Sequence, residues 1–156
     1  MDQERLVAVL RALEQHGVRY VVFGGIALNL HGLVRATEDV DIFIAADAQN
    51  VEALKTAFRS VFSDPSIDEI SPDDLLGEYP AIQYIPPDGA FHVDILTRLG
   101  EAYRYEDLEQ QRVPFAGLQI PIVTPRMLYR MKRDTVRLQD KADAEMLRRR
   151  FGGELD

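Results

Sequence analysis

The stretch RATEDVDIFI, residues 35–44, places two carboxylates, Asp39 and Asp41, inside an otherwise apolar run. In a β-strand, residues i and i+2 point to the same face, so both acids would lie side by side near apolar surface. Like charges about 4 Å apart repel by roughly 4 kcal/mol at an effective dielectric constant of ~20. A bound cation would remove that repulsion.

A second apolar stretch, FHVDIL at residues 91–96, contains a third acid, Asp94. The strand alternation puts Asp94 on one face with His92, while Val93 and Ile95 point to the other face. If the two strands are neighbours, the three carboxylates converge. Such oxygen clusters suit magnesium or manganese, and two of these ions can hold a nucleoside triphosphate during in-line attack at phosphorus.

Each acid also has a structural interpretation that the sequence leaves open. Asp39 could cap the turn before its strand, Asp41 could pair with Arg35, and Asp94 could lie on a solvated face. Taken one at a time, the structural interpretation is the more common one. The glycine pattern described next is what favours chemistry.

The segment VVFGGIALNLHG, residues 21–32, puts Gly24 and Gly25 between a predicted strand and a predicted helix. Glycine lets the backbone approach a phosphate closely, and a helix N-terminus offers free N–H donors. The pattern is neither a P-loop nor a dinucleotide fingerprint, because the lysine and the third glycine are missing. A phosphate site that is followed closely in the sequence by a carboxylate pair is nevertheless uncommon by chance, so the order favours a nucleotide site.

The elements that must position these residues alternate along the chain. Helices are predicted through Leu6–Leu13, over 26–33, over 48–62 with Asp47 as N-cap, from Thr124, and over 139–150; strands are predicted at 19–23, 40–45, 81–86, 91–96 and 118–123, with a loop at 63–80. Because of Pro121, the strand at 118–123 is predicted to be an edge strand. The pattern indicates an α/β (mixed α+β) fold, a mixed sheet flanked by helices. We expect one domain, 1–156, with C-terminal helices at about 124–150.

Composition excludes several classes of site. The 18 Lys and Arg against 26 Asp and Glu give a net charge of 18 − 26 = −8, which is unfavourable for general nucleic-acid binding. The chain has no cysteine, so disulfides and thiolate zinc sites are excluded, and its three histidines are scattered. No apolar run has the length of a membrane span, and the N-terminus does not have the pattern of a signal peptide. We therefore expect a cytoplasmic protein without membrane contact.

Together, Gly24–Gly25, Asp39-x-Asp41 and Asp94 resemble the signature of the polymerase-beta-like nucleotidyltransferase superfamily. The string of Arg35, Thr37, Asp39 and Asp41 is similar to one branch of it, the AbiEii-type toxins and related small nucleotidyltransferases. The resemblance covers residues 20–44 and 91–96. It implies a nucleotidyltransferase-like sheet and transfer of a nucleoside monophosphate from an NTP to an acceptor hydroxyl, with release of pyrophosphate.

The resemblance also implies roles for individual residues. Asp39, Asp41 and Asp94 would be the catalytic and metal-binding residues for two Mg²⁺ (or Mn²⁺) ions, and Asp94 would favour deprotonation of the acceptor. Gly24, Gly25, Arg35 and Thr37 would belong to the nucleotide site. The acceptor is left open between RNA, protein and small molecules. Because few residues follow Asp94, acceptor recognition could need a partner protein or a homodimer.

The C-terminal segment concentrates positive charge, and the late residues Lys132, Arg137, Asp140 and Asp143 resemble a string in the related toxins. One interpretation places Lys132 or Arg137 against the triphosphate or the acceptor. The other is a solvated helix face with ion pairs, such as Arg137 with Asp140. The sequence supports both equally.

Two further hypotheses belong to other classes of protein. The chain could be a non-catalytic nucleotide-binding or regulatory protein that keeps the fold, or an Asp-x-Asp glycosyltransferase that holds a sugar nucleotide through one metal. A role in a toxin–antitoxin system follows from family analogy alone.

Overall fold

The computed structural model describes residues 2–77, 80–89, 91–133 and 137–155. Its helices are α1 (Gln3–Gln15), α2 (Gly24–Leu30), α3 (Ala48–Val61), α4 (Pro72–Leu76), α5 (Pro125–Arg133) and α6 (Leu138–Phe151). Its strands are β1 (Tyr20–Phe23), β2 (Asp39–Ile44), β3 (Ala81–Tyr84), β4 (His92–Leu96), β5 (Arg98–Leu99), β6 (Tyr103–Arg104), β7 (Gln110–Phe115) and β8 (Leu118–Val123). Three 3₁₀ helices are η1 (Pro65–Glu69), η2 (Tyr105–Asp107) and η3 (Gly152–Glu154).

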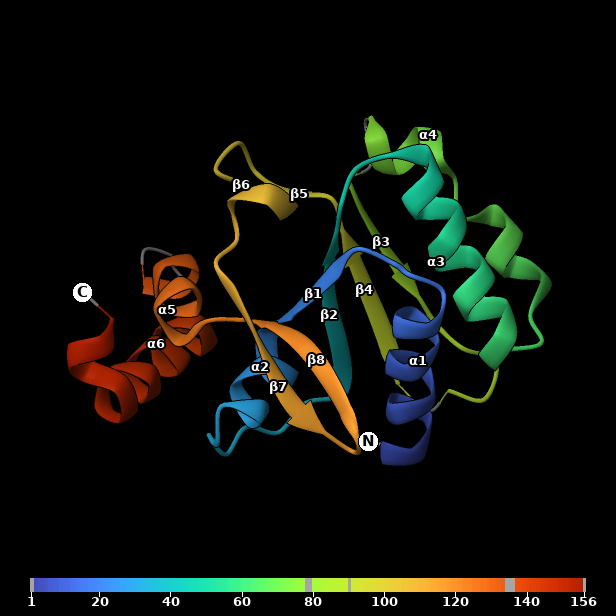
Figure 1. The fold of residues 1–156 in the computed structure, drawn as a ribbon. Coiled ribbons are helices and arrows are strands. Elements are labelled where there is room, and N and C mark those ends of the chain that lie inside the picture. Colours follow the sequence, from blue (N-terminus) through green and yellow to red (C-terminus); the bar gives the residue numbers. More distant parts are fainter. Residues whose placement is uncertain (1, 78–79, 90, 134–136, 156) are drawn as a thin grey trace.

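One mixed sheet forms the centre of the molecule, in the order β3–β4–β2–β1–β8–β7 (Figure 1). The pairs β2–β4 and β1–β8 are parallel, and the remaining neighbours are antiparallel. The short β5–β6 hairpin stands apart from the sheet. The predicted α/β class, a mixed sheet flanked by helices with a helical C-terminus, is confirmed.

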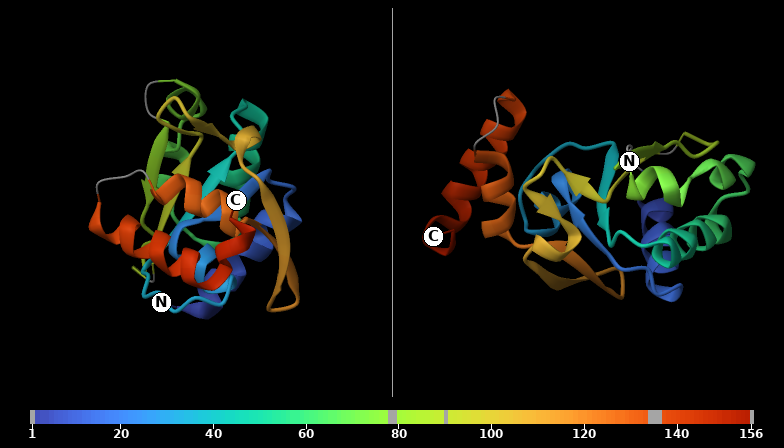
Figure 2. Two further views of the ribbon diagram at one scale, coloured as in Figure 1. Left: turned by 90° about the vertical axis from the view of Figure 1, so that its left-hand side faces the viewer. Right: turned by 90° about the horizontal axis from the view of Figure 1, so that it is seen from above.

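The sheet has two different faces because side chains alternate along each strand. Val40 and Ile42 of β2 lie opposite Val93 and Ile95 of β4, and all four are fully buried. On the same face, Tyr84 of β3 stacks on Phe58 of α3, with ring centroids 5.1 Å apart. Helices α1 and α3 cover this face, while α5 and α6 lie on the opposite side of the molecule (Figure 2). The other sheet face therefore remains available for polar residues.

The strand predicted at 118–123 was placed wrongly at the edge of the sheet. β8 lies between β1 and β7, with Val22 opposite Ile122 and Arg112 opposite Pro121. The outer strand is β7, which the sequence analysis missed. Four of its six side chains are exposed, so it has no apolar alternation to reveal it.

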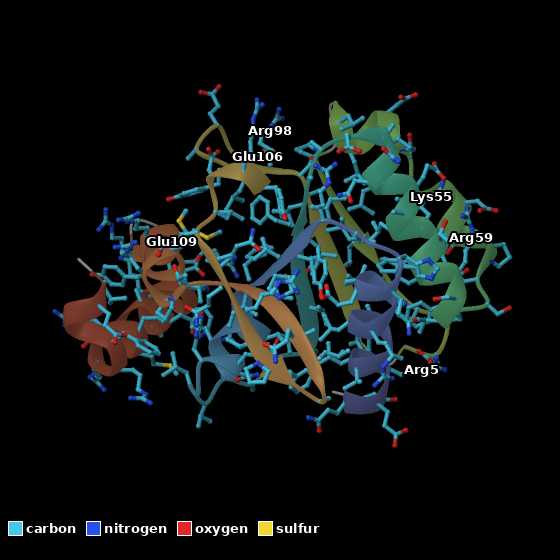
Figure 3. All side chains as sticks on the ribbon, in the orientation of Figure 1. Arg5, Lys55, Arg59, Arg98, Glu106 and Glu109 are labelled. Carbon is cyan, nitrogen blue, oxygen red and sulfur yellow. The ribbon has the colours of Figure 1, made fainter. Side chains whose placement is uncertain are left out.

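The region 63–80 was predicted as loop, but its described part contains η1 and α4. Each is too short to show a helical period, and each starts with a side-chain cap, from Asp64 and Ser71 respectively. Figure 3 shows Arg59 on α3 beside this region, where its Nη2 contacts Asp68 Oδ1 at 2.5 Å. The predicted Asp47 cap of α3 is confirmed, since its carboxylate accepts from the Asn50 amide at 2.7 Å.

Asn50 is a buried polar residue that the sequence analysis did not single out. Its side chain, 4% exposed, accepts from the Arg19 amide at 2.8 Å. It donates to the carbonyls of Arg19 and Ala45, both at 3.0 Å. One amide group thus joins the segment before β1, the end of β2 and the start of α3.

We predict that Asn50→Ala lowers the free energy of unfolding by about 2–3 kcal/mol, because it removes three hydrogen bonds of a buried side chain to the backbone. Urea denaturation of the purified protein measures the change. Gln49→Ala, an exposed neighbour on the same helix, is the matched control and should change stability by less than about 0.5 kcal/mol. Equal effects of the two variants would contradict this role for Asn50.

Candidate active site

The three predicted carboxylates lie on the open face of two adjacent strands. Asp41 of β2 stands directly opposite Asp94 of β4 in the parallel register, and Asp39 is two residues earlier on the same face as Asp41. Gln83 of β3 is opposite Asp94 and donates to its Oδ1 at 3.1 Å. The convergence expected from the strand pattern is therefore present in the fold.

Asp41 is the acid of this cluster whose pKa is raised. Burial, followed by the hydrogen bond and charge of Asp94 and the charge of Asp39, raises the pKa of Asp41 to about 7. The charge of Lys132 acts in the opposite direction. The alternative pairing of Asp41 with Arg35 is wrong, because the Arg35 guanidinium instead binds Asp143 on α6, with Nε 3.1 Å from Oδ1.

The glycine pair is shaped by the same acids. Phe23 is opposite Asp41, and the next residue, Gly24, has φ +68°. A Cβ at Gly24 would lie 2.1 Å from Asp41 Oδ2, so both backbone conformation and space require glycine. A Cβ at Gly25 would lie 2.9 Å from the Thr37 hydroxyl oxygen. Helix α2 begins at Gly24 itself, so the helix N-terminus lies at the carboxylates.

Thr37 and His92 hold Asp39 from two sides. The Thr37 hydroxyl donates to the Asp39 carbonyl at 3.0 Å and accepts from the Asp39 amide at 3.3 Å. The Asp39 carboxylate lies 3.5 Å from His92 Nδ1. In the part of the chain that the structure describes, no three acidic or histidine side chains are arranged as around a bound metal ion. The donor set nevertheless fits a hard divalent cation, because three carboxylates cluster there and burial, together with Asp94 and Asp39, raises the pKa of Asp41.

A cleft of about 1080 Å³ lies between this sheet face and the helices α5 and α6. All the site residues that the sequence analysis singled out line it: Gly24, Gly25, Arg35, Thr37, Asp39, Asp41, Asp94, Lys132 and Arg137. They come from five separate segments of the chain. The structure thus brings the glycine turn, the acids and the late basic residues to one concave surface.

The two late basic residues differ in their surroundings. Lys132 has a 13% exposed side chain, and its Nζ lies 2.9 Å from Asp143 and 3.2 Å from Asp140. Arg137 is 75% exposed, with its Nε 3.8 Å from Asp140. The ion pairs of the second interpretation are present, and both cations also line the cleft, while a contact with the triphosphate or the acceptor stays a prediction. The residues between α5 and α6, 134–136, lie outside the described residues.

The apolar part of the cleft was not predicted from the sequence. Leu96, Leu99, Leu128 and Met131 line it together with Phe23. Leu128 and Met131 follow a helical period, but core packing produces the same period, so spacing alone does not separate the two uses. Leu99 is 40% exposed on β5, and single exposed apolar side chains are common, so its place in the cleft is known only from the fold.

Solved structures of the same fold are nucleotidyltransferases. A putative nucleotidyltransferase from Thermotoga maritima aligns with TM-score 0.57 and 17% identity, over 97% of this chain and 92% of that one. ANT(2″)-Ia, in a complex with adenylyl-2″-tobramycin, aligns with TM-score 0.58 and 16% identity over 99% and 92%. An antigenic nucleotidyltransferase-like protein from Paracoccidioides brasiliensis gives 0.54 and 17% over 94% and 75%. No curated protein matches the chain.

A family model described as "Nucleotidyl transferase AbiEii toxin, Type IV TA system" matches residues 7–132, which include the glycine turn, the three acids and Lys132. The chain belongs to this family and is a nucleotidyltransferase, as its resemblance to the superfamily indicated. Within the described residues, no helix is both long and apolar enough to cross a membrane.

We predict that Gly24→Ala destabilises the protein by about 2–5 kcal/mol in urea denaturation, from a left-handed backbone and a collision with Asp41. Gly17 is a matched control, because its φ of +65° is similar and a Cβ there would meet nothing within 4 Å. Gly17→Ala should cost only about 1–2 kcal/mol. Equal losses would show that the approach of Gly24 to Asp41 does not matter.

A second prediction concerns pH and uses metal-free protein. The unfolded chain releases the Asp41 proton near pH 3.8 and the folded protein near pH 7, so the wild type loses stability as pH rises between these values. Asp41→Asn should therefore be more stable than wild type above pH 7, by on the order of 2–4 kcal/mol, with no advantage near pH 4. Denaturation at several pH values measures the difference.

Glu69→Gln, which removes an exposed carboxylate of η1, is the control and should show no such pH-dependent gain. A metal-free Asp41→Asn variant that is less stable than wild type at every pH would mean that this acid serves the fold.

Proposed function

We propose that this chain transfers a nucleoside monophosphate from a nucleoside triphosphate to an acceptor hydroxyl, with release of pyrophosphate, in a reaction that depends on Mg²⁺ or Mn²⁺. The observation that supports it most is the register of β2 and β4, which puts Asp41 opposite Asp94 beside the Gly24 turn. Three clustered carboxylates beside a glycine turn suit phosphoryl chemistry, because divalent ions bound to them would act on the phosphates. Without such ions, their repulsion would only destabilise the fold.

The carboxylates of Asp39, Asp41 and Asp94 would hold two divalent ions. When bound, such ions neutralise charge on the phosphates and stabilise the developing charge at phosphorus. The backbone N–H groups at Gly24 and Gly25 would donate to the phosphate oxygens, since α2 begins there. Lys132, Arg35 and Arg137 supply positive charge on the other wall of the cleft, and Thr37 keeps Asp39 in place.

The reaction requires one proton transfer and one exchange of bonds at phosphorus. The acceptor oxygen forms a bond to the α-phosphorus, and the bond from that phosphorus to the oxygen bridging to the β-phosphate breaks. Pyrophosphate leaves with that oxygen. Asp94 takes the proton of the acceptor hydroxyl, and Gln83, which donates to the Asp94 carboxylate, orients it.

The biological setting follows from family membership. A family described as a type IV toxin supports a role in a toxin–antitoxin system, in the cytoplasm where NTPs are available. The acceptor can be RNA, a protein or a small molecule, recognised with a partner protein or in a homodimer. We propose that residues 1–156 act as one domain, because Arg35, in the segment before β2, binds Asp143 of α6.

We predict that magnesium with one or more of the four NTPs raises the melting temperature of the wild type, while magnesium or NTP alone does so less. A ligand at 100 times its Kd adds ~2.7 kcal/mol of stability, which a thermal-shift assay resolves. The magnesium-dependent part should disappear in Asp41→Asn and Asp94→Asn. Glu69→Gln should behave as wild type.

Release of pyrophosphate in the presence of candidate acceptors tests the chemical step. Magnesium-dependent binding of NTP without pyrophosphate release from any acceptor would favour the non-catalytic nucleotide-binding alternative. Binding that survives in Asp41→Asn would exclude the carboxylate cluster as the metal site.

A further inference from the structure

Asp143 of α6 is a fully buried carboxylate, with 0% exposure. It accepts hydrogen bonds from three side chains: Arg35 Nε at 3.1 Å, Lys132 Nζ at 2.9 Å and Gln139 Nε2 at 3.0 Å. These donors come from the segment before β2, from α5 and from α6. An ionised group is retained inside a protein only when it is paired and hydrogen-bonded in this way.

Asp143 lies behind the wall of the cleft. Arg35 and Lys132 line the cleft, as does Asp140, whereas Asp143 does not. The buried carboxylate therefore holds two cations from the rear, with their remaining surface toward the cleft. Because Asp143 itself is fully buried and accepts from three donors, it is a permanent partner rather than an exchangeable one.

Asp140 is placed differently, although it binds the same amine. Its carboxylate lies 3.2 Å from Lys132 Nζ and 3.8 Å from Arg137 Nε, on the cleft side. Arg35 and Lys132 carry two positive charges, and Asp140 and Asp143 carry two negative charges. A phosphate group that approaches Lys132 must compete with Asp140 for its N–H donors.

We propose that Asp143 is a positioning residue, which aims Lys132 and Arg35 at the polyphosphate of the donor nucleotide, and that Asp140 is the partner which the polyphosphate displaces. The two acids stand three residues apart on one helix and contact one amine, yet they have opposite effects on binding. Asp143 favours the polyphosphate complex, and Asp140 opposes it. The inference rests on the proposed function for the identity of the ligand.

Inorganic triphosphate is the probe, because it carries the charge of the donor without its base, and AMP is the comparison. Both are titrated calorimetrically in magnesium buffer. Asp143→Asn should weaken inorganic triphosphate binding by about tenfold, while AMP binding changes by less than about twofold. The variant weakens the charge-assisted hydrogen bonds that hold Lys132 and Arg35, and these two cations are aimed at the polyphosphate. Asp140→Asn should strengthen inorganic triphosphate binding about threefold or more, because it removes the negative charge that competes with the polyphosphate for Lys132.

Two further variants separate positioning from general structural damage. Glu145→Gln removes a carboxylate on the same helix that binds Arg148 and Arg149 away from the cleft, and it should leave both affinities unchanged. In a Lys132→Met background, Asp140→Asn should no longer strengthen binding. If Asp143→Asn does not fold, the Asp140→Asn and Lys132→Met cycle still tests the displacement of Asp140, because Asp140 is partly exposed.

Changes of the same sign in Asp140→Asn and Asp143→Asn would overturn the inference, as would a wild type that does not bind inorganic triphosphate. These results are distinguishable from failure of the proposed function. A chain that binds inorganic triphosphate with the opposite variant effects, but releases no pyrophosphate from any NTP, would retain this inference and lose the reaction.

Discussion

The repulsion between carboxylates on β2 and β4 is the constraint around which this molecule is arranged. Asp41 and Asp94 stand opposite one another on neighbouring strands, with Asp39 two residues away on the same face. Burial, followed by the hydrogen bond and charge of Asp94 and the charge of Asp39, raises the pKa of Asp41 to about 7. The sheet withstands this because its other face is a continuous core. Val40 and Ile42, on either side of Asp41 in sequence, are fully buried against the side covered by α1 and α3.

The same constraint explains the turn after β1. Phe23 is paired with Asp41, so the chain passes the carboxylate as it leaves the strand. No side chain fits at Gly24, and the left-handed backbone there turns directly into α2. The free N–H groups of a helix start therefore lie at the carboxylates, where a phosphate and its cations would meet. A turn that looks like a weak glycine pattern in the sequence is required by the position of an acid 17 residues later.

The sequence was sufficient to find this face of the site, because strand alternation is a local property. The apolar neighbours of Asp39, Asp41 and Asp94 identify their strands, and a period of two then decides which residues share a face. Elements without such a period were missed. β7 has four exposed side chains out of six, η1 and α4 are too short, and β8 is internal although Pro121 suggested an edge.

The other wall of the cleft could not be predicted from local sequence patterns, because contacts between residues far apart in the sequence define it. Arg35 was a candidate partner for Asp41, six residues away, yet its partner is Asp143, 108 residues away. Nothing in the spacing of Lys132, Asp140 and Asp143 tells which acid is buried and which faces the cleft. That distinction appears only when α6 packs on α5 and the segment before β2 closes over it.

Part of this wall lies after residue 132, where the family match ends. The carboxylate face thus lies within the range that the family model matches, whereas the cationic wall also depends on how α6 is attached. A difference in polyphosphate affinity among nucleotidyltransferases of this fold is therefore expected to follow the residues around Asp143 more closely than the three acids.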